Sequence, residues 1–389
     1  MGDKKFDVVV YGATGYTGKL VVDYMVSNYG NVENFRWAIA GRSKTKLKSV
    51  KDAFDLPESI GTIVVDSNDQ DSVDTMVKQS KCVLTTVGPY QLYGTNILRA
   101  CAEIGTDYVD LCGEPAWMYQ MIQEYDDKAK DSGARIVFSC GFDSIPFDLG
   151  VYLVQKKAEA IQGSPAKNVR GRVRAMNGEF SGGTAASLTA TMASLKKKPE
   201  LIKVLGNPFS LANGFQGPQQ PNDSKPIYDE ILETWVSPFF MAPINTKNIH
   251  RSNALLNHAY GQDLRYNEMW IQGPGDIGKA AAEAIAGANP LADAPEPGEG
   301  PSKESRENGN YDVLFCADLD DGSVLSISVK GDMDPGYGST SKMIAESAIC
   351  LLQDCTELEG GIYTPAASMG EMLITRLEAN AGLTFTEEN

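Results

Sequence analysis

Three glycines spaced three residues apart are the first residues of the chain with a recognisable chemical use. They are Gly12, Gly15 and Gly18, in the stretch VVVYGATGYTGKLV. The apolar run before them predicts a strand and the run after them a helix, so the glycines occupy the turn between the two. There the first glycine permits the tight turn, the second lets backbone approach a pyrophosphate, and the third lets the helix pack close to the sheet. This pattern predicts a dinucleotide-binding loop, with a plain glycine-rich turn as the alternative.

The end of the second predicted strand indicates which dinucleotide this loop would bind. Enzymes that prefer NAD place an aspartate or glutamate there to hold the ribose 2′-hydroxyl. The stretch RWAIAGRSKTK has Gly41, Arg42 and Ser43 instead. A guanidinium can grip a 2′-phosphate through two hydrogen bonds. We therefore predict NADP(H) as the cofactor, and a solvated surface charge is the alternative role of Arg42.

Polar residues and glycines also follow the fourth, fifth and sixth predicted strands. The three motifs are VGPYQLYG (87–94), LCGEP (111–115) and CGFDSIP (140–146). Ligands of open α/β sheets bind at the carboxyl ends of the strands. We therefore expect these motifs to meet at one crevice, although each alone could be an ordinary loop.

The elements that must position these residues alternate along roughly the first 150 residues. Strand-like runs separated by helix-like runs predict a parallel, doubly wound sheet, with the first helix beginning near Lys19. The six strand-like runs are DVVVY (7–11), RWAIA (36–40), TIVVD (62–66), CVLTTVG (82–88), DYVDLC (107–112) and RIVFSC (135–140).

The pattern changes after Pro146. NVRGRVRAM (168–176) alternates, with Arg170, Arg172 and Arg174 on one face, which predicts a strand with one wet face, as in an antiparallel sheet. DDG (320–322) lies between two strand-like runs and predicts a hairpin. Two segments rich in Pro and Gly, 206–226 and 287–310, predict surface loops that could act as lids. The expected domains are 1–148, completed by 336–389, and an inserted mixed α/β domain over 149–335.

Composition limits the kind of partner. The chain has 35 Lys and Arg against 51 Asp and Glu, a net charge of −16, which argues against nucleic acid as a partner. Its apolar runs are shorter than the roughly 18 residues that a membrane-spanning helix needs, so we expect a cytoplasmic protein. The 7 cysteines contain no C-x-x-C pair and there are 2 histidines, so we expect no metal site.

The motifs of this chain are similar to those of the saccharopine dehydrogenase-like oxidoreductases, and within them to the trans-acting enoyl reductases of bacterial lipid biosynthesis. The resemblance runs nearly from end to end. It rests on GATGYTG, AGRS, TTVGPYQLYG, GTDYVDLCGE, ARIVFSCGFDSIPFDLG, SGGT, INTKNIHRSNALL, PGEGPS, DPGYGSTSKM and TPAASMGE.

The resemblance implies an α/β fold with a Rossmann-type sheet completed by C-terminal helices. An inserted mixed domain would cover the site and mediate a homodimer. The implied cofactor residues are Gly12, Ala13, Thr14, Gly15, Tyr16 and Thr17 at the pyrophosphate, Arg42 and Ser43 at the 2′-phosphate, and Val87, Gly88 and Pro89 near the nicotinamide ribose.

The resemblance also implies a substrate, the double bond of an enoyl thioester carried by coenzyme A or a carrier protein. Hydride would go to the β-carbon and a proton to the α-carbon, so the site needs an oxyanion donor and an acid. Tyr93 and Asp143 are the predicted catalytic residues, because both follow strands at the crevice edge. Tyr90, Ser144 and Tyr337 are further candidates, and the tyrosines could instead only pack against the substrate.

Two other functions stay open. Saccharopine-type joining of an amino acid to a semialdehyde would need cations facing the site, for which Arg170, Arg172, Arg174 and Arg251 are available. The second open function is that of a lipid-associated protein that binds NADP without turnover. Peripheral contact with a lipid surface is an open alternative as well. The aromatic segment LETWVSPFFMAPI (232–244) indicates a core segment or a dimer interface rather than an acyl groove. The motif SGGT (181–184) indicates a helix cap rather than an anion site.

Overall fold

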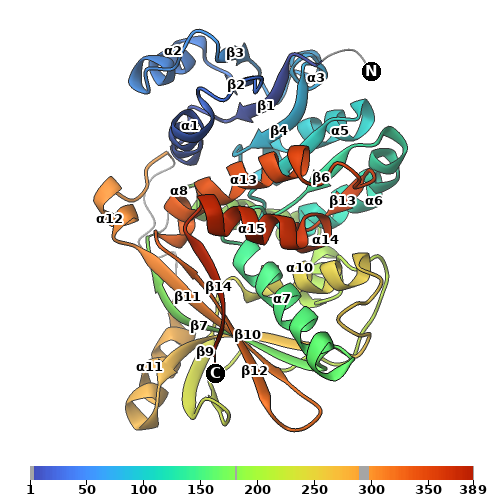
Figure 1. The fold of residues 1–389 in the computed structure, drawn as a ribbon, viewed down its shortest axis with the longest axis vertical. Helices are drawn as coiled ribbons and strands as arrows, with labels where there is room; N and C mark the ends of the chain where they lie inside the picture. The colour runs from blue at the N-terminus through green and yellow to red at the C-terminus, as the bar shows by residue number, and fades with distance from the viewer. Residues whose placement is uncertain (1–3, 180–181, 289–297, 389) are drawn as a thin grey trace.

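The structure is a computed structural model that describes residues 4–179, 182–288 and 298–388. Figure 1 shows two sheets joined by helices, one in the upper half of the view and one in the lower half. Sheets A and B each have 7 strands in this described part. The α/β fold with a parallel Rossmann-type sheet and a second, mixed sheet is therefore confirmed.

Sheet A is parallel throughout and has the strand order β13-β6-β5-β4-β1-β2-β3. Its strands are β1 (Phe6–Tyr11), β2 (Trp37–Gly41), β3 (Gly61–Val64), β4 (Ser80–Thr85), β5 (Asp107–Asp110), β6 (Arg135–Val137) and β13 (Gly361–Tyr363). The connecting helices are α1 (Tyr16–Tyr29), α2 (Lys44–Ala53), α3 (Gln70–Lys78), α4 (Tyr90–Tyr93), α5 (Thr95–Ile104) and α6 (Pro115–Ser132). The prediction placed the start of the first helix near Lys19, but α1 begins at Tyr16, directly after Gly15, because glycine serves as the N-cap.

Sheet B has the order β14-β12-β11-β7-β10-β9-β8. Its strands are β7 (Asn168–Asn177), β8 (Ile227–Asp229), β9 (Thr234–Pro238), β10 (Arg265–Gly273), β11 (Asn310–Asp318), β12 (Val324–Gly331) and β14 (Leu383–Glu388). The predicted hairpin is confirmed as β11 and β12, which pair antiparallel. Strand β7 pairs antiparallel with β11 but parallel with β10, so its setting is mixed.

The remaining helices lie around sheet B or return to sheet A. They are α7 (Ile145–Gln162), α8 (Gly182–Lys197), α9 (Leu201–Gly206), α10 (Ala242–Leu255), α11 (Gly275–Gly287), α12 (Lys303–Glu307), the π-helical turn η1 (Pro335–Ser339), α13 (Thr340–Gln353), α14 (Pro365–Ser368) and α15 (Gly370–Asn380). Segment 206–226 has no helix or strand after Gly206, as predicted for a loop. In the other predicted loop, residues 289–297 lie outside the described part and 303–307 form α12.

The arginine face of β7 differs from the prediction. It is not a wet face, because each arginine is paired with an acid. Arg172 is 2% exposed and its Nε lies 2.7 Å from an Asp229 carboxylate oxygen. Arg170 pairs with Asp318, and Arg174 with both Glu388 and Asp312. Alternation alone predicted the strand but could not show that neighbouring strands carry the matching acids.

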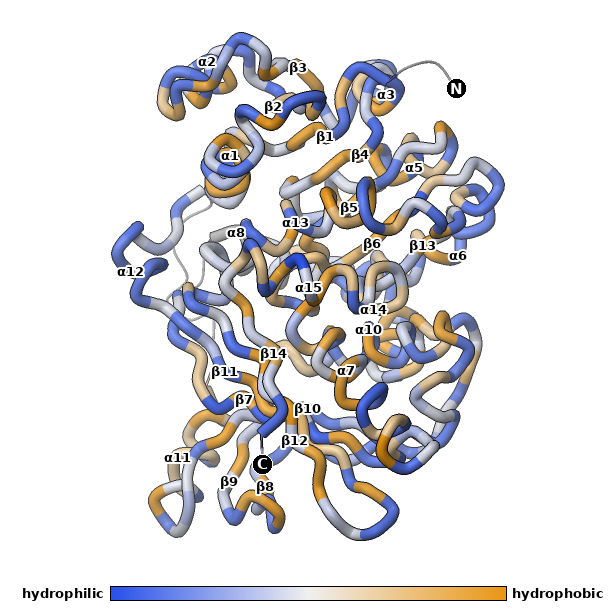
Figure 2. The backbone as a smooth tube through the Cα atoms, in the orientation of Figure 1, coloured by the Kyte–Doolittle hydropathy of each residue, from blue (hydrophilic) through white to orange (hydrophobic). Residues whose placement is uncertain are grey.

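The C-terminal segment divides between the two sheets. Helix α13 packs against α1, β4 and β5, and β13 adds to the edge of sheet A beside β6. Strand β14, which the expected boundaries assigned to the first domain with the rest of 336–389, pairs with β12 in sheet B instead. Figure 2 shows hydrophobic residues along the strands of both sheets and mainly hydrophilic residues on α12 at the periphery.

Candidate active site

The glycine loop between β1 and α1 has the close contacts that require glycine. Gly12 has φ +95°, and a Cβ there would lie 2.6 Å from Thr86 Oγ1. A Cβ on Gly18 would lie 2.0 Å from the carbonyl oxygen of Gly12, so the third glycine lets the helix approach the turn. At Gly15 the nearest atom to such a Cβ is 3.4 Å away, and no side chain caps α1 there. The N–H groups at the start of α1 are therefore open to an anion.

The end of β2 lies beside this loop. A Cβ on Gly41 would lie 3.6 Å from Thr14 Oγ1. Arg42 is exposed and makes no hydrogen bond or ion pair within the described residues. Ser43 is the N-cap of α2, and its Oγ accepts a hydrogen bond from Lys46 N at 3.3 Å. Arg42 and Ser43 thus directly follow a residue that lies beside the loop, and the guanidinium has no partner among the described residues.

The loop after β4 is held in place by the loop after β5. The backbone N–H groups of Tyr90 and Gln91 donate to the two carboxylate oxygens of Glu114, at 2.8 and 2.9 Å. Val87 lies against the glycine loop, where a Cβ on Gly12 would be 2.8 Å from its Cγ2. Two of the three motifs predicted to share a crevice are therefore joined directly.

Helix α8 reaches the same loop from the sheet B side. A Cβ on Gly88, which precedes the buried Pro89, would lie 3.8 Å from Ser187 Oγ. Gln91 Nε2 donates to Thr191 Oγ1 at 3.1 Å. The predicted cap or anion site at SGGT lies outside the described part of the chain, which lacks Ser181 and the side chains of 182–184.

The tyrosines proposed as acids differ in their surroundings. Tyr90 is buried, and its hydroxyl donates to Thr85 O at 3.1 Å and accepts from Leu111 N at 3.0 Å. It therefore ties two strand ends together. Tyr93 is 37% exposed, and its hydroxyl makes no hydrogen bond with a described residue. The ring of Tyr337 is buried and packs edge-on against Tyr16, with 5.2 Å between the ring centroids.

The loop after β6 carries a buried polar cluster. The Ser144 hydroxyl donates to Asn245 Oδ1 at 2.7 Å and accepts from Asn248 Nδ2 at 2.7 Å. Next to it, Asp143 Oδ1 is buried and has no hydrogen-bond partner among the described residues. Burial raises the pKa of Asp143 to about 7, so this carboxyl group is partly protonated near neutral pH.

The cluster continues into sheet B through Glu268. This carboxyl group is fully buried and accepts hydrogen bonds from Asn245 Nδ2 at 2.7 Å and from the Tyr266 hydroxyl at 2.8 Å. Burial first, and then the charge of Asp143, raises the pKa of Glu268 to about 8. We call Asp143, Ser144, Asn245, Asn248 and Glu268 the acid cluster; it spans the junction between the end of β6 and sheet B.

Several known proteins are similar in sequence to this chain over nearly its whole length. A trans-acting enoyl reductase of Mycobacterium ulcerans is 34% identical over 405 residues, 96% of this chain and 96% of that protein. One from Mycobacterium tuberculosis is 32% identical over 409 residues, again 96% of each chain. A further Mycobacterium tuberculosis protein is 36% identical over 97% of this chain and 96% of its own. The family model of the saccharopine dehydrogenase NADP binding domain matches residues 8–137.

The chain belongs to the saccharopine dehydrogenase-like oxidoreductases. Within them it is grouped with the trans-acting enoyl reductases, and it is an NADP-dependent oxidoreductase. The solved structure of apo saccharopine dehydrogenase (L-Glu forming) from Saccharomyces cerevisiae has the same fold, with a TM-score of 0.56, 11% identity and 98% of this chain covered, 99% of its own.

The residues of this oxidoreductase fit NADP(H), the predicted cofactor. The uncapped start of α1 suits a pyrophosphate, and the unpaired Arg42 suits a 2′-phosphate. Ala13 is fully buried, Thr17 is half-buried in the first turn of α1, and the Tyr16 ring packs on Tyr337. In this structure Ala13 and Tyr16 can therefore serve the phosphates only through their backbones.

Sequence reasoning missed Asn245, Asn248 and Glu268 as site residues of this oxidoreductase. The stretch INTKNIHRSNALL, which lies in α10 and its C-cap, contained a signal that could have pointed to them. Polar residues are seldom fully buried, yet those of this helix face the interior. The buried polar residues are Asn245, Thr246, Lys247, Asn248, His250, Arg251, Ser252 and Asn253. A helix with no wet face predicts a polar interior site.

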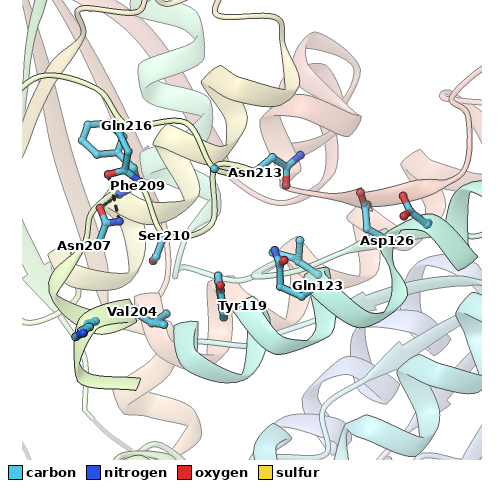
Figure 3. A pocket seen from close by; sticks show the side chains of 13 residues that line it. Tyr119, Gln123, Asp126, Val204, Asn207, Phe209, Ser210, Asn213 and Gln216 are labelled. Carbon is cyan, nitrogen blue, oxygen red and sulfur yellow. Dashed lines mark hydrogen bonds between the residues drawn. The ribbon is translucent and has the colours of Figure 1, made fainter. Parts of the chain in front are cut away.

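A separate pocket of about 550 Å³ lies on the outer face of α6. Figure 3 shows Tyr119, Gln123 and Asp126 of α6 facing the loop that carries Asn207 and Ser210. None of the predicted site residues lines it. This pocket is therefore distinct from the predicted site residues, which follow the strands of sheet A.

No helix in the described part of this oxidoreductase combines the length and apolar character needed to cross a membrane. The aromatic segment 232–244 belongs to the core. Phe239 is 2% exposed and lies against Phe147, Phe240 and Trp270, with centroid distances of 5.7, 4.9 and 6.3 Å. An acyl groove at Phe239 would require these rings to separate.

Proposed function

We propose that this oxidoreductase reduces the carbon–carbon double bond of an enoyl thioester with NADPH, in lipid biosynthesis. The observation that carries the proposal is the acid cluster, in which Asp143, in the loop after β6, has a buried carboxylate oxygen, Oδ1, without a hydrogen-bond partner among the described residues. Reduction of a conjugated double bond needs a proton donor of this kind. The names of the relatives support the same reaction.

When bound at the glycine loop, NADPH would be the source of the hydride that adds to the β-carbon. The π electrons of the double bond then move toward the thioester carbonyl, and negative charge develops on its oxygen. The Tyr93 hydroxyl donates a hydrogen bond to that oxygen, because it has no competing bond within the described residues. Neutral Asp143 gives its proton to the α-carbon and becomes a carboxylate. Ser144 and the two asparagines fix the loop that holds Asp143.

Glu268 helps to hold the Asp143 loop in position, and to keep Asp143 protonated, near neutral pH. As long as Glu268 is protonated it adds no negative charge next to Asp143, and its bond to Asn245 holds the amide that binds Ser144. We therefore assign Glu268 a positioning role, and Asp143 and Tyr93 the contacts with substrate.

The saccharopine-type alternative is less well supported by the cations available. Its substrates carry several carboxylates, which need free guanidinium or ammonium groups. Arg170, Arg172 and Arg174 are paired with acids of sheet B. Arg251 is fully buried and donates to Leu211 O at 2.7 Å and to Asn213 Oδ1 at 3.0 Å. All four candidates are therefore already engaged.

The test is NADPH oxidation by the purified protein with a panel of enoyl-coenzyme A thioesters and, separately, with saccharopine-pathway substrates. We expect oxidation with the thioesters alone, and formation of the saturated thioester. Tyr93→Phe should lower turnover without weakening NADPH binding. Tight NADPH binding without oxidation by either panel would contradict the proposal and favour the lipid-associated protein without turnover.

The same proposal includes a homodimer in the cytoplasm and a thioester presented on coenzyme A or a carrier protein. Light scattering of the purified protein gives the oligomeric state. Comparing coenzyme A and carrier-protein thioesters of one acyl chain tests the carrier, since a strong preference for one would identify it. Sedimentation with lipid vesicles tests peripheral lipid contact.

A further inference from the structure

Segment 300–306, between β10 and β11, contacts the glycine loop through Tyr16. The Tyr16 hydroxyl donates to Pro301 O at 2.5 Å and accepts from Arg306 Nη1 at 2.9 Å. A Cβ on Gly300 would lie 2.6 Å from the tyrosine ring, so only glycine fits under it. The inserted domain therefore reaches the first residue of α1.

Arg306 carries a charge that no described carboxylate contacts directly, although the charge of nearby Asp334 acts on it. Its Nη1 donates only to neutral oxygens, those of Tyr16 and of Pro301 at 2.7 Å. It forms no ion pair with a described carboxylate, whereas Arg170, Arg172 and Arg174 all do. Glu307 on the same short helix pairs with Lys303 instead.

The acid that lies close to Arg306 is also engaged elsewhere. The carboxylate oxygens of Asp334 accept from the backbone N–H groups of Tyr337 and Gly338, at 3.0 and 2.7 Å. Asp334 meets Arg306 through the backbone, its N–H donating to Arg306 O at 2.9 Å. These contacts fix α12 against η1 and leave the Nε and Nη2 donors of the guanidinium without a described partner.

A half-buried arginine whose described partners are a tyrosine ring and neutral oxygens keeps donors and charge that can bind an anion. The open N–H groups of α1 begin at Tyr16, the residue that holds this guanidinium, and they attract the same kind of ligand. The pyrophosphate of NADP(H) carries two negative charges, one more than a helix terminus neutralises well.

We propose that Arg306 binds the cofactor's pyrophosphate from the inserted domain, and that the Tyr16 hydroxyl positions its guanidinium. Arg42, which follows β2, holds the 2′-phosphate, so the two arginines recognise different phosphates. NADP(H) binding then adds to the contacts that already hold segment 300–306 against the loop.

Calorimetric titration with two ligands separates these roles. NADP⁺ carries both phosphate groups, whereas adenosine 2′-monophosphate carries the 2′-phosphate and no pyrophosphate. Arg306→Gln should raise the Kd for NADP⁺ about tenfold and leave the Kd for adenosine 2′-monophosphate within about twofold, as expected for one charge-assisted contact. Arg42→Gln should raise the Kd for both ligands. Tyr16→Phe should raise the Kd for NADP⁺ by less than Arg306→Gln does.

Lys303→Gln is the matched control, because it removes one positive charge from the same helix at a side chain that is 78% exposed. It should leave both affinities unchanged. Thermal unfolding without ligand is followed for each variant, and Arg306→Lys, which keeps the charge, replaces Arg306→Gln if the latter does not fold. An unchanged NADP⁺ affinity, or an equal loss for both ligands, would overturn the proposal.

Discussion

At the scale of single residues, position after a strand was enough to select Arg42 and Asp143 as candidates. Both follow a strand of the parallel sheet, and the chain topology then places them at its carboxyl edge. Glu268 could not be selected in this way, because it lies within β10 of the other sheet and its hydrogen bond to the site is made through Asn245. Its importance depends on packing between elements far apart in the sequence, which no local pattern encodes.

Asp143→Asn tests the proposed acid directly. Turnover should fall about 100-fold, the usual size of a general-acid contribution, while NADPH affinity stays within about twofold. In the unmodified enzyme the acid form is lost as pH rises through the pKa of about 7, so turnover at saturating NADPH should decline above that pH. Stopped-flow NADPH oxidation across pH measures both effects. A flat pH profile would contradict this role.

Glu268→Gln tests the buried carboxyl through stability. In the folded protein the pKa is about 8, against an ordinary 4.5 that applies once the chain unfolds. The folded state therefore binds more protons between these values, and this group lowers stability as pH rises from 4.5 toward 8. Glutamine cannot ionise, so the variant should lose fewer degrees of Tm than the parent protein over that range. Equal slopes of Tm against pH would show that Glu268 ionises normally.

At the scale of elements, the strands and helices of the first half could be predicted because each is local. Apolar runs marked the strands, and glycines marked the turn into α1. The setting of β7 could not be predicted. Its pattern is that of an antiparallel strand with a wet face, but β10 pairs with it in parallel and Asp229 covers Arg172. Partner strands, and hence the burial of a charged face, are decided by tertiary structure.

Gly18→Ala tests the contact between turn and helix. The added methyl group would lie 2.0 Å from the Gly12 carbonyl oxygen, so α1 must move away from the loop. We expect a Tm lower by several degrees and NADPH binding weakened at least tenfold, about the effect of losing one good phosphate contact. Gly287→Ala is the control, because a Cβ on that helical glycine would have no described atom of another element within 4 Å. Fluorescence titration and thermal unfolding report the two effects.

At the scale of the whole molecule, the chain passes back and forth between the two sheets. The path runs from sheet A through α7 into sheet B, back through α13 and β13 to sheet A, and ends with β14 in sheet B. Figure 1 shows α13, drawn in orange, beside the blue and cyan strands of sheet A. We propose that residues 149–335 are an insertion between parts that fold together.

A fragment of residues 1–148 tests this interleaving. It lacks α13, whose Met343, Ile344 and Ile349 are fully buried, so it would expose the surface of β4 and β5 that α13 covers. We expect it to bind NADPH poorly and to aggregate. Joining residues 336–380 to it through a flexible linker should restore soluble, NADPH-binding protein. Cooperative unfolding of the short fragment alone would contradict the expectation.

The late position of α13 and β13 also affects synthesis on the ribosome. Strands β5 and β6 leave the ribosome first, and their missing neighbours follow about 200 residues later, a delay on the order of ten seconds or more at ordinary rates of translation. During that interval the apolar surface of β4 and the edge of β6 face solvent on the nascent chain. Newly made chains of this enzyme should therefore depend on a holding chaperone until residue 363 has emerged.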